Sequence, residues 1–364
     1  MAAAIEVSIV VPVYNPPIER FQSCLKSVIA QSSDAWELVL VDDGSTDTAV
    51  LNELACVERR YDRVKVIRQE NAGPSTARNV GTRSASGKYV TYVDCDDELP
   101  PKAIEMAVSK LDEHRPDLLQ FYVQYVTSEQ QKIGIEEVPV VALSNDQVRR
   151  LRGRVMSGRM PETRIRNRRA VMKNGPIARY VRTDIAKRVP FPPEIRVSED
   201  TVWNLLLLNE VDYLLVSRSI GYWYWTDLES SVRGYRPNAY EETKQLLKLL
   251  NEMQRSHLTA VPVDDYYERA LGEVNRCIRL NFSRPESPIS EREKRGKIRD
   301  LLDTIEVSRR QALRSRSVVW VKLVAKHTLL ASGMVGPCYA VLRAARAGAA
   351  RVGQGKRWLN VKGG

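Results

Sequence analysis

Four polar clusters follow apolar runs in the first 100 residues, and the last of them is the strongest chemical signal. It reads Asp94-Cys95-Asp96-Asp97 and comes directly after the apolar run 89–93. Three carboxylates in four residues repel one another, and a divalent cation would neutralise them. Hard oxygen ligands favour Mg²⁺ or Mn²⁺, which can also bridge a diphosphate. The alternative is a solvated acidic turn that caps the next helix, because acids are common at helix starts.

Two of the other clusters offer groups that could contact a nucleotide. Asp42 and Asp43 follow a second apolar run, and their carboxylates could accept hydrogen bonds from a base or a ribose. A plain turn explains the Gly44 and Ser45 that come next equally well. Tyr14 ends the run Val11-Pro12-Val13, and its ring could stack on a nucleobase or pack in the core.

The remaining cluster runs from Asn71 through Gly73 and Pro74 to Gly81. Arg78 and Asn79 would lie on the first turns of a helix here, which is a good place to meet a nucleotide. The alternative for Arg78 is a surface side chain.

An alternation of strands and helices must position these clusters. Strands are expected at 5–13, 36–41, 64–67, 89–93 and 118–126, and helices near 21–29, 49–60, 75–84 and 100–114. The alternation predicts a parallel sheet with helices on both faces. Ligands bind such sheets beyond the carboxyl ends of the strands, which is where the four clusters fall.

The rest of the chain carries weaker patterns. Residues 144–196 are Arg-rich and irregular, and could hold helices and a mobile loop. Beyond them we expect a buried helix at 200–208, a strand at 213–217, an aromatic cluster at 221–225, and helices at 239–253, 266–280 and 291–305.

The four clusters together, over about residues 5–130, resemble the family-two glycosyltransferases of the GT-A fold. Each motif is weak alone, and the ordered set is specific. The resemblance implies an α/β fold with a Rossmann-like mixed sheet and helices on both faces. The helical patterns after about residue 235 add a C-terminal helical extension to it. The resemblance also implies a nucleotide-sugar donor, usually linked to UDP, and a divalent cation, Mn²⁺ or Mg²⁺. Asp96 takes the metal-ligand position of the D-x-D motif by this resemblance. The donor-nucleotide contacts would be Pro12, Tyr14, Asp42, Asp43, Asn71, Arg78, Asp94 and Cys95.

The resemblance continues to Ser198-Glu199-Asp200, which follows a Phe-Pro-rich approach. In the family this aspartate is the proposed catalytic base. An acceptor hydroxyl is a poor nucleophile until a carboxylate takes its proton. One base with direct displacement would invert the anomeric centre. The alternative is that Ser198 and Asp200 only cap the following helix.

Four further residues are candidates for acceptor or diphosphate contacts: Asp97, Glu199, Trp223 and Arg233. Aromatic faces stack well on sugar rings, and an arginine could close over a diphosphate. Family members often carry an arginine where this chain has Thr226 and Asp227, so the closing residue stays open between Arg233 and none. A structural aromatic cluster is the alternative for Trp223.

The net charge of +11 comes from the end of the chain. Residues 307–364 contain twelve Lys and Arg and no acid, which leaves 44 basic and 45 acidic residues in the body. Such a tail indicates a polyanionic partner. Its charge-free run 328–342 is shorter than the ~20 residues of a membrane span, so an interfacial segment on an anionic membrane is favoured. Two packed helices are the alternative. No nucleic-acid-binding module is recognisable, so nucleic acid is not expected.

These patterns predict three regions: a catalytic domain at 1–235, a helical extension at 236–310 and a basic tail at 311–364. The N-terminus shows no secretory signal, and the five cysteines are scattered, which favours a reducing compartment. We therefore expect a cytoplasmic enzyme, peripheral at the inner face of the plasma membrane. It would transfer a sugar to a saccharide or lipid-linked glycan in cell-surface polysaccharide synthesis. Alternatives are a nucleotidyltransferase acting on a sugar phosphate and a non-catalytic nucleotide-sugar-binding protein. The oligomeric state is open.

Overall fold

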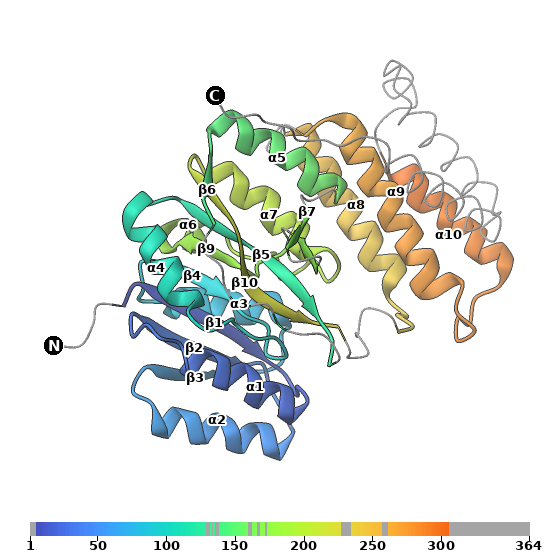
Figure 1. Ribbon diagram of the computed structural model, residues 1–364. Helices are drawn as coiled ribbons and strands as arrows, with labels where there is room; N and C mark the ends of the chain where they lie inside the picture. Colours follow the sequence, from blue (N-terminus) through green and yellow to red (C-terminus); the bar gives the residue numbers. More distant parts are fainter. Residues whose placement is uncertain are drawn as a thin grey trace. The chain divides into compact units, whose positions relative to one another are not determined.

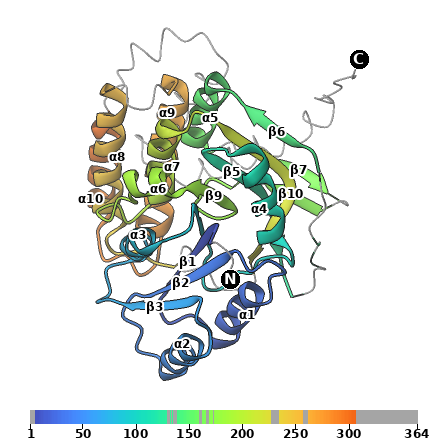
Figure 2. The ribbon, with the colours of Figure 1, turned by 90° about the vertical axis from the view of Figure 1, so that its left-hand side faces the viewer.

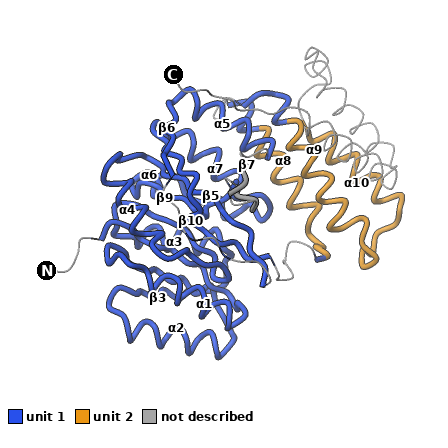
Figure 3. Tube along the Cα trace, viewed as in Figure 1, with its two compact units in different colours: residues 1–234, 252–266 blue, residues 235–251, 267–364 orange. Residues whose placement is uncertain are grey.

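The computed structural model (Figure 1) describes residues 5–128, 132, 134, 138–158, 162–165, 168–171, 173–226, 234–256 and 261–305. The described residues divide into two compact units (Figure 3). One lies within 1–234 and 252–266, and the other within 235–251 and 267–364. Arg233 and the expected tail at 311–364 lie outside the described residues.

The first part of unit 1 alternates strands and helices, as the sequence predicts. The elements are β1 (Val7–Val13), α1 (Ile18–Ile29), β2 (Trp36–Asp42), α2 (Thr48–Arg60), β3 (Val64–Arg68), α3 (Pro74–Ser84), β4 (Tyr89–Tyr92), α4 (Ala103–His114) and β5 (Leu118–Val126). Strands β2 and β4 flank β1, β3 lies outside β2, and all of these pairs are parallel. Their carboxyl ends therefore share one edge of the sheet.

Helices cover both faces of this sheet (Figure 2). The alternation of side chains along β1 explains how they pack there. Ile9 and Val11 join a buried cluster that includes Phe21 of α1 and side chains of α2 and α4. Val10 points to the other face, where α3 packs. A Cβ atom at Gly81 of α3 would collide with Val10 and come within 3.2 Å of Val41. Glycine thus allows α3 to lie directly on the sheet.

The second part of unit 1 makes the sheet mixed. The strand order is β3-β2-β1-β4-β9-β5-β10-β6, and β8 pairs with both β5 and β7. Strand β9 (Arg179–Arg182) is antiparallel to both β4 and β5. The region expected to be irregular also holds α5 (Asn145–Ser157), α6 (Thr183–Arg188), β7 (Glu162–Ile165) and β8 (Arg168–Val171). The mixed α/β fold is as predicted, whereas the strands of this Arg-rich region were not.

The last elements of unit 1 position the residues of the candidate site. Helix α7 (Glu199–Glu210) agrees with the expected buried helix. The expected strand at 213–217 and the aromatic cluster at 221–225 form one strand, β10 (Leu214–Trp225), which pairs in parallel with β5 and antiparallel with β6 (Val140–Leu143).

The helical part of the chain contains α8 (Ala239–Arg255), α9 (Val263–Cys277), the short π-helix Ile278–Phe282 and α10 (Glu291–Thr304). In unit 2 these helices bury Leu246, Leu250, Leu271 and Leu301. None of the helices in the described ranges combines the length and the apolar composition that crossing a bilayer requires.

Candidate active site

The first two strands bring the expected nucleotide contacts to one edge of the sheet. Val13 of β1 pairs with Asp42 of β2, and the N–H of Asp43 donates to the carbonyl of Val13 at 2.8 Å. Tyr14 is the next residue, and 53% of its surface is exposed, so its ring is not part of the core. Pro12 stays within β1, opposite Val41. A flat exposed ring at this edge is free to stack on a base.

Asp42 and Asp43 are both buried, and both shape the loops of the site. Oδ1 of Asp42 accepts the N–H of Ser45 at 2.9 Å, which fixes the turn after β2. The carboxylate of Asp43 accepts the N–H groups of Ala72 and Gly73, each at 2.8 Å, and the side-chain amide of Gln69 at 2.7 Å. Asp43 therefore holds the loop before α3. Asn71, in the same loop, is exposed.

The loop ends at Gly73, whose φ of +92° favours glycine. A Cβ atom there would stand 2.5 Å from Nη1 of Arg196, so a larger residue would displace that guanidinium. Helix α3 begins at Pro74, which suits a first helical turn.

Arg78 on α3 is only 6% exposed, so it is not the surface side chain of the alternative interpretation. Its Nη2 donates to Oδ1 of Asp94 at 2.9 Å, and its Nη1 lies 4.0 Å from Oδ1 of Asp200. Burial opposes the charge of Arg78, but Asp94, Asp200 and Glu199 outweigh it and raise the pKa of the guanidinium. One buried cation thus links two carboxylates that are more than 100 residues apart in the sequence.

Asn79, the neighbour of Arg78, explains why Asp200 arrives at this place. Its side-chain amide donates to the carbonyl of Phe191 at 2.8 Å and accepts the N–H of the same residue at 2.7 Å. Phe191 stacks on Trp203 of α7 with 4.3 Å between ring centroids. The Trp203 indole N–H donates to the carbonyl of Val189. The Phe-Pro approach is therefore fixed to α3 and to α7 at once.

Asp200 lies in the first turn of α7, with Oδ1 buried and 37% of its side chain exposed. Burial raises the pKa of Asp200 to about 7, against the opposing charge of Arg78 and with the help of Glu199 and Asp94. A Cβ atom at Gly175 would lie 3.3 Å from Oδ2, so the neighbouring chain approaches closely. A carboxyl with a pKa near neutrality can take a proton at neutral pH and release it again.

The motif after β4 is fixed to β10 through its last acid. Asp97 is 2% exposed; Oδ2 accepts the phenol of Tyr222 at 2.8 Å, and Oδ1 accepts the N–H of Trp225 at 2.8 Å. The Tyr222 oxygen in turn accepts the N–H of Asp94 at 3.0 Å. Burial, followed by repulsion from Asp94 and Asp96, raises the pKa of Asp97 well above its ordinary value. Asp97 positions the motif and has no carboxylate oxygen left without a protein donor.

Asp96 and Cys95 differ from Asp97 in this respect. Burial and then the charges of Asp96 and Asp94 raise the pKa of the Cys95 thiol, while the backbone of Tyr14 opposes the shift, so the first and last motifs lie near each other. Asp96 is half-buried. Burial, and after it the charge of Asp94, raises the pKa of Asp96, while Arg20 opposes the shift. No side chain in the described ranges is recorded as donating a hydrogen bond to Asp96, so its carboxylate can bind another group.

This donor set fits a divalent cation that takes some of its ligands from water and from the substrate. Within the described ranges no three His, Cys, Asp or Glu side chains form a metal cage. Mg²⁺ is commonly held by one or two carboxylates, waters and substrate phosphates rather than by a complete protein cage. Burial first and then the charge of Asp94 raise the pKa of Asp96, and a nearby cation would oppose both effects. The residues thus fit a cation that arrives with a diphosphate.

The other candidate contacts have separate places. Glu199 begins α7 and is half-buried. Trp223 is 8% exposed and lies on β10, where its backbone pairs with Glu98. Arg233 is outside the described residues.

Sequence reasoning missed a buried arginine behind Asp200. Arg179 of β9 is 1% exposed; its guanidinium donates to Asn204 and Gln120 and to the carbonyl of Lys173. Burial lowers the pKa of Arg179 to about 9, although the charge of Asp200 opposes this shift. The available signal was an arginine inside the largely apolar stretch 177–181, and the many other arginines of this region obscured it.

Comparisons with known proteins identify relatives of this chain. Residues 8–175 match the family model described as Glycosyl transferase family 2. An uncharacterized glycosyltransferase, YibD of Escherichia coli (strain K12), is 39% identical over 116 residues, which are 32% of this chain and 33% of that protein. Glycosyltransferase GlyG of Streptococcus pneumoniae serotype 4 (strain ATCC BAA-334 / TIGR4) is 33% identical over 155 residues, which are 39% of this chain and 50% of GlyG. The chain thus spans no more than half of the length of either relative.

A solved structure extends the likeness to most of the chain. The crystal structure of S. aureus TarS 1–349 in complex with UDP has a TM-score of 0.59 and 20% sequence identity, over 92% of this chain and 91% of that one. At this identity the likeness shows the fold alone. Residues 8–175 thus match glycosyltransferase family 2, and the fold of the chain is that of the GT-A neighbour.

Proposed function

We propose that the protein is an inverting glycosyltransferase. It transfers a sugar from a nucleoside-diphosphate sugar to a hydroxyl of a saccharide or lipid-linked glycan, in cell-surface polysaccharide synthesis. The observation that carries the proposal is the guanidinium of Arg78, which lies against both Asp94 and Asp200. Arg78 and Asp94 fall within the residues that match family 2, and Asp200 follows them in the chain. The contact of Arg78 with both carboxylates joins the motif for the donor to the candidate base.

The donor nucleotide lies along the ends of β1 and β2 in this proposal. Tyr14 stacks on the base, and Asp42 and Asp43 shape its polar surroundings. Arg78 of α3 supports the nucleotide at the same edge of the sheet. UDP is the proposed nucleotide, because TarS, which shares the fold, has been solved in complex with UDP and with UDP-GlcNAc.

Asp96 holds the proposed Mn²⁺ or Mg²⁺. When bound, such a cation would neutralise the charge that develops on the leaving diphosphate. Asp97 and Tyr222 act only through position: their hydrogen bond keeps the motif in place at the end of β4.

Asp200 is the proposed catalytic base. Its carboxylate takes the proton of the acceptor hydroxyl as that oxygen attacks the anomeric carbon, and the bond from this carbon to the diphosphate oxygen breaks. The nucleoside diphosphate leaves, and attack from the opposite side inverts the configuration. The pKa of about 7 suits this task, because a base works best when its pKa lies near the operating pH.

A thermal-shift panel of nucleotide-sugars, with and without Mn²⁺, tests the donor assignment. A ligand that binds the folded state raises Tm by mass action, so a UDP-sugar should stand out when Mn²⁺ is present. Turnover should release UDP from that sugar. Release of pyrophosphate from UTP and a sugar phosphate, without UDP release, would instead identify a nucleotidyltransferase.

The basic residues after 310 are proposed to hold the protein on an anionic membrane at the cytoplasmic face. The support is their sequence: ten Lys and Arg and no acid follow residue 310. Sedimentation with phosphatidylglycerol vesicles should be lost when the chain is ended at residue 310, after the last described helix. Equal binding of both chains would overturn this part of the proposal.

A further inference from the structure

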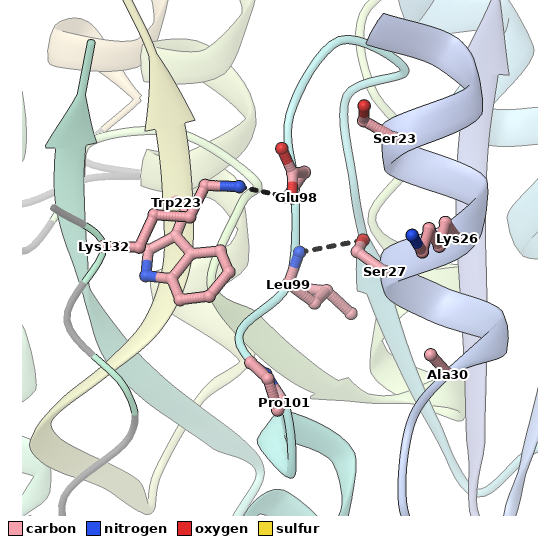
Figure 4. A pocket seen from close by; sticks show the side chains of 9 residues that line it. All are labelled: Ser23, Lys26, Ser27, Ala30, Glu98, Leu99, Pro101, Lys132 and Trp223. Atoms are coloured by element: carbon pink, nitrogen blue, oxygen red, sulfur yellow. Dashed lines mark hydrogen bonds and ion pairs between the residues drawn. The ribbon is translucent and has the colours of Figure 1, made fainter. Parts of the chain in front are cut away.

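A pocket of about 320 Å³ lies next to the acidic motif and begins one residue after Asp97. Three segments form its walls (Figure 4): α1, the segment that follows the motif, and β10. Its polar lining includes Ser23, Lys26, Ser27 and Glu98, and its apolar lining includes Leu99 and Trp223. None of the donor contacts proposed above lines it.

Hydrogen bonds hold the walls in place. The N–H of Trp223 donates to the carbonyl of Glu98 at 2.9 Å, and the N–H of Glu98 donates back at 3.2 Å. On the other side the N–H of Leu99 donates to Oγ of Ser27 at 3.1 Å, as the dashed line in Figure 4 shows. The pocket is therefore preformed, which is typical of ligand sites.

The charged groups of the pocket are not equivalent. The Glu98 carboxylate accepts the indole N–H of Trp225 at 2.9 Å and pairs with Nζ of Lys132 at 2.7 Å, so its charge is compensated. Lys26 is exposed, and the structure records no ion pair for it among the described residues. Two lysines against one glutamate leave a net positive charge, with Lys26 available.

The size and the lining of the pocket limit the class of ligand that it can bind. A volume near 320 Å³ is at the low end for ligand pockets, which suits one sugar unit better than a nucleotide-sugar. The Trp223 indole is 8% exposed, and Nζ of Lys132 lies 4.8 Å from its ring centroid, so the part of the indole that lines the pocket beside the hydroxyl groups is the surface against which a sugar ring can pack. The available ammonium adds a preference for a negative substituent.

We propose that this pocket is an acceptor subsite for one acidic sugar unit, whose ring packs against Trp223 and whose carboxylate or phosphate pairs with Lys26. The inference rests on the proposed function, because it places the acceptor beside the acidic motif. It names the class of acceptor: a glycan that carries uronate or phosphate groups.

The test measures the binding of three probes to the full chain by ligand-observed NMR, with no nucleotide-sugar present. Glucuronate, glucose 6-phosphate and glucose have similar rings and differ in charge. At least one acidic probe should bind roughly threefold or more tightly than glucose, the size expected of one exposed ion pair. The two acidic arms distinguish a carboxylate from a phosphate.

Lys26→Ala should remove the preference and leave the weak binding of glucose unchanged. Lys248→Ala is the matched control, because Lys248 is likewise an exposed helical lysine and does not line the pocket. Trp223→Leu should weaken all three probes. Equal binding of charged and neutral probes, no binding, or an unchanged preference in Lys26→Ala would overturn the subsite.

UDP binding to the same samples separates this proposal from the transferase assignment. If UDP binds and the acidic sugars do not, the subsite is wrong and the proposed function stands. If UDP does not bind with Mn²⁺ present, the proposed function fails, whatever the sugars do.

Discussion

Nη1 of Arg78 lies 4.0 Å from Oδ1 of Asp200, and both atoms are buried without a hydrogen-bond partner among the described residues. A buried donor and a buried acceptor that face each other beyond hydrogen-bond distance are costly for the fold. Catalytic hydrogen bonds are often long without substrate and shorten in the complex. We interpret the gap as the place where substrate binding brings the guanidinium and the base together.

Asp200→Asn should slow transfer strongly and stabilise the fold. Loss of a general base costs roughly 10²–10⁴-fold in kcat. Because the pKa of Asp200 is about 7 in the folded chain, the ionised carboxylate is unfavourable there, and this penalty is complete above pH 7. Its removal at pH 8 should raise the unfolding free energy by roughly 1 kcal/mol, discounted for the side chain's exposure.

The comparison of melting temperatures at two pH values checks this prediction. At pH 4 most of the penalty is absent from the parent chain, so the two proteins should melt at nearly the same temperature. Full activity of Asp200→Asn, or a lower Tm at pH 8, would contradict the assignment.

The rate of transfer should rise with pH through about 7. The base acts in its ionised form, and burial holds the pKa of Asp200 near that value. Arg78→Met removes the cation that opposes this shift, so the acidic limb of kcat/KM should move to higher pH, by roughly one unit. Arg188→Met, which removes an exposed arginine of α6, is the control. A limb that stays in place in Arg78→Met would show that the titrating group is not Asp200.

Substitutions of Asp43 and Tyr14 should differ in their effects on the free energy of unfolding and on nucleotide binding. Asp43→Asn places an amide donor where the carboxylate accepts the N–H groups of the loop before α3, so it should cost roughly 1–3 kcal/mol and weaken nucleotide binding. Tyr14→Ala removes a largely exposed ring and should weaken only binding. Urea unfolding and UDP titration of both variants check this. A large loss of stability in Tyr14→Ala would mean that the ring is structural.

Glu37→Gln should destabilise the protein and spare its chemistry. Glu37 stands at the start of β2, away from the carboxyl ends of the strands. Burial works against its charge, but hydrogen bonds from Lys65, Ser8 and Ser86 lower its pKa to about 2. A lowered carboxyl pKa stabilises the fold above pH 4.5, and this contribution is lost as pH falls towards 2.

Denaturant unfolding at pH 7 should therefore show a loss on the order of 2 kcal/mol for Glu37→Gln, and activity per folded molecule should be unchanged. The difference from the parent chain should shrink as the pH approaches 2. An equal difference at pH 7 and pH 2 would show that the charge of Glu37 is not its source.

The sequence predicts the first half of unit 1 well, because each strand there is a continuous apolar run and each helix has a clear period. β5 has the expected bounds, and β2 and α3 differ from the expected ranges by one residue. The strand β9 could not be predicted in this way. Its buried Arg179 is satisfied by Asn204 and Gln120, and such long-range partners leave no local pattern.

The candidate site divides in the same way. Spacing alone could indicate that Asp42 and Asp96 share an edge of the sheet, because parallel strands end together. It could not indicate that Arg78 is buried or that Asp200 reaches it. That arrangement depends on the paired hydrogen bonds between Asn79 and Phe191, which join positions 112 residues apart. Sequence spacing likewise could not indicate that Asp97 holds the motif in place through Tyr222 and Trp225.

The most direct test is UDP binding measured by calorimetry, with and without Mn²⁺, for the parent chain and for Asp96→Asn. Mn²⁺ should tighten UDP binding to the parent chain and have no such effect on Asp96→Asn, while both proteins remain folded without ligand. Binding of UDP that is identical in the two proteins with Mn²⁺ present, or no UDP binding at all, would contradict the account.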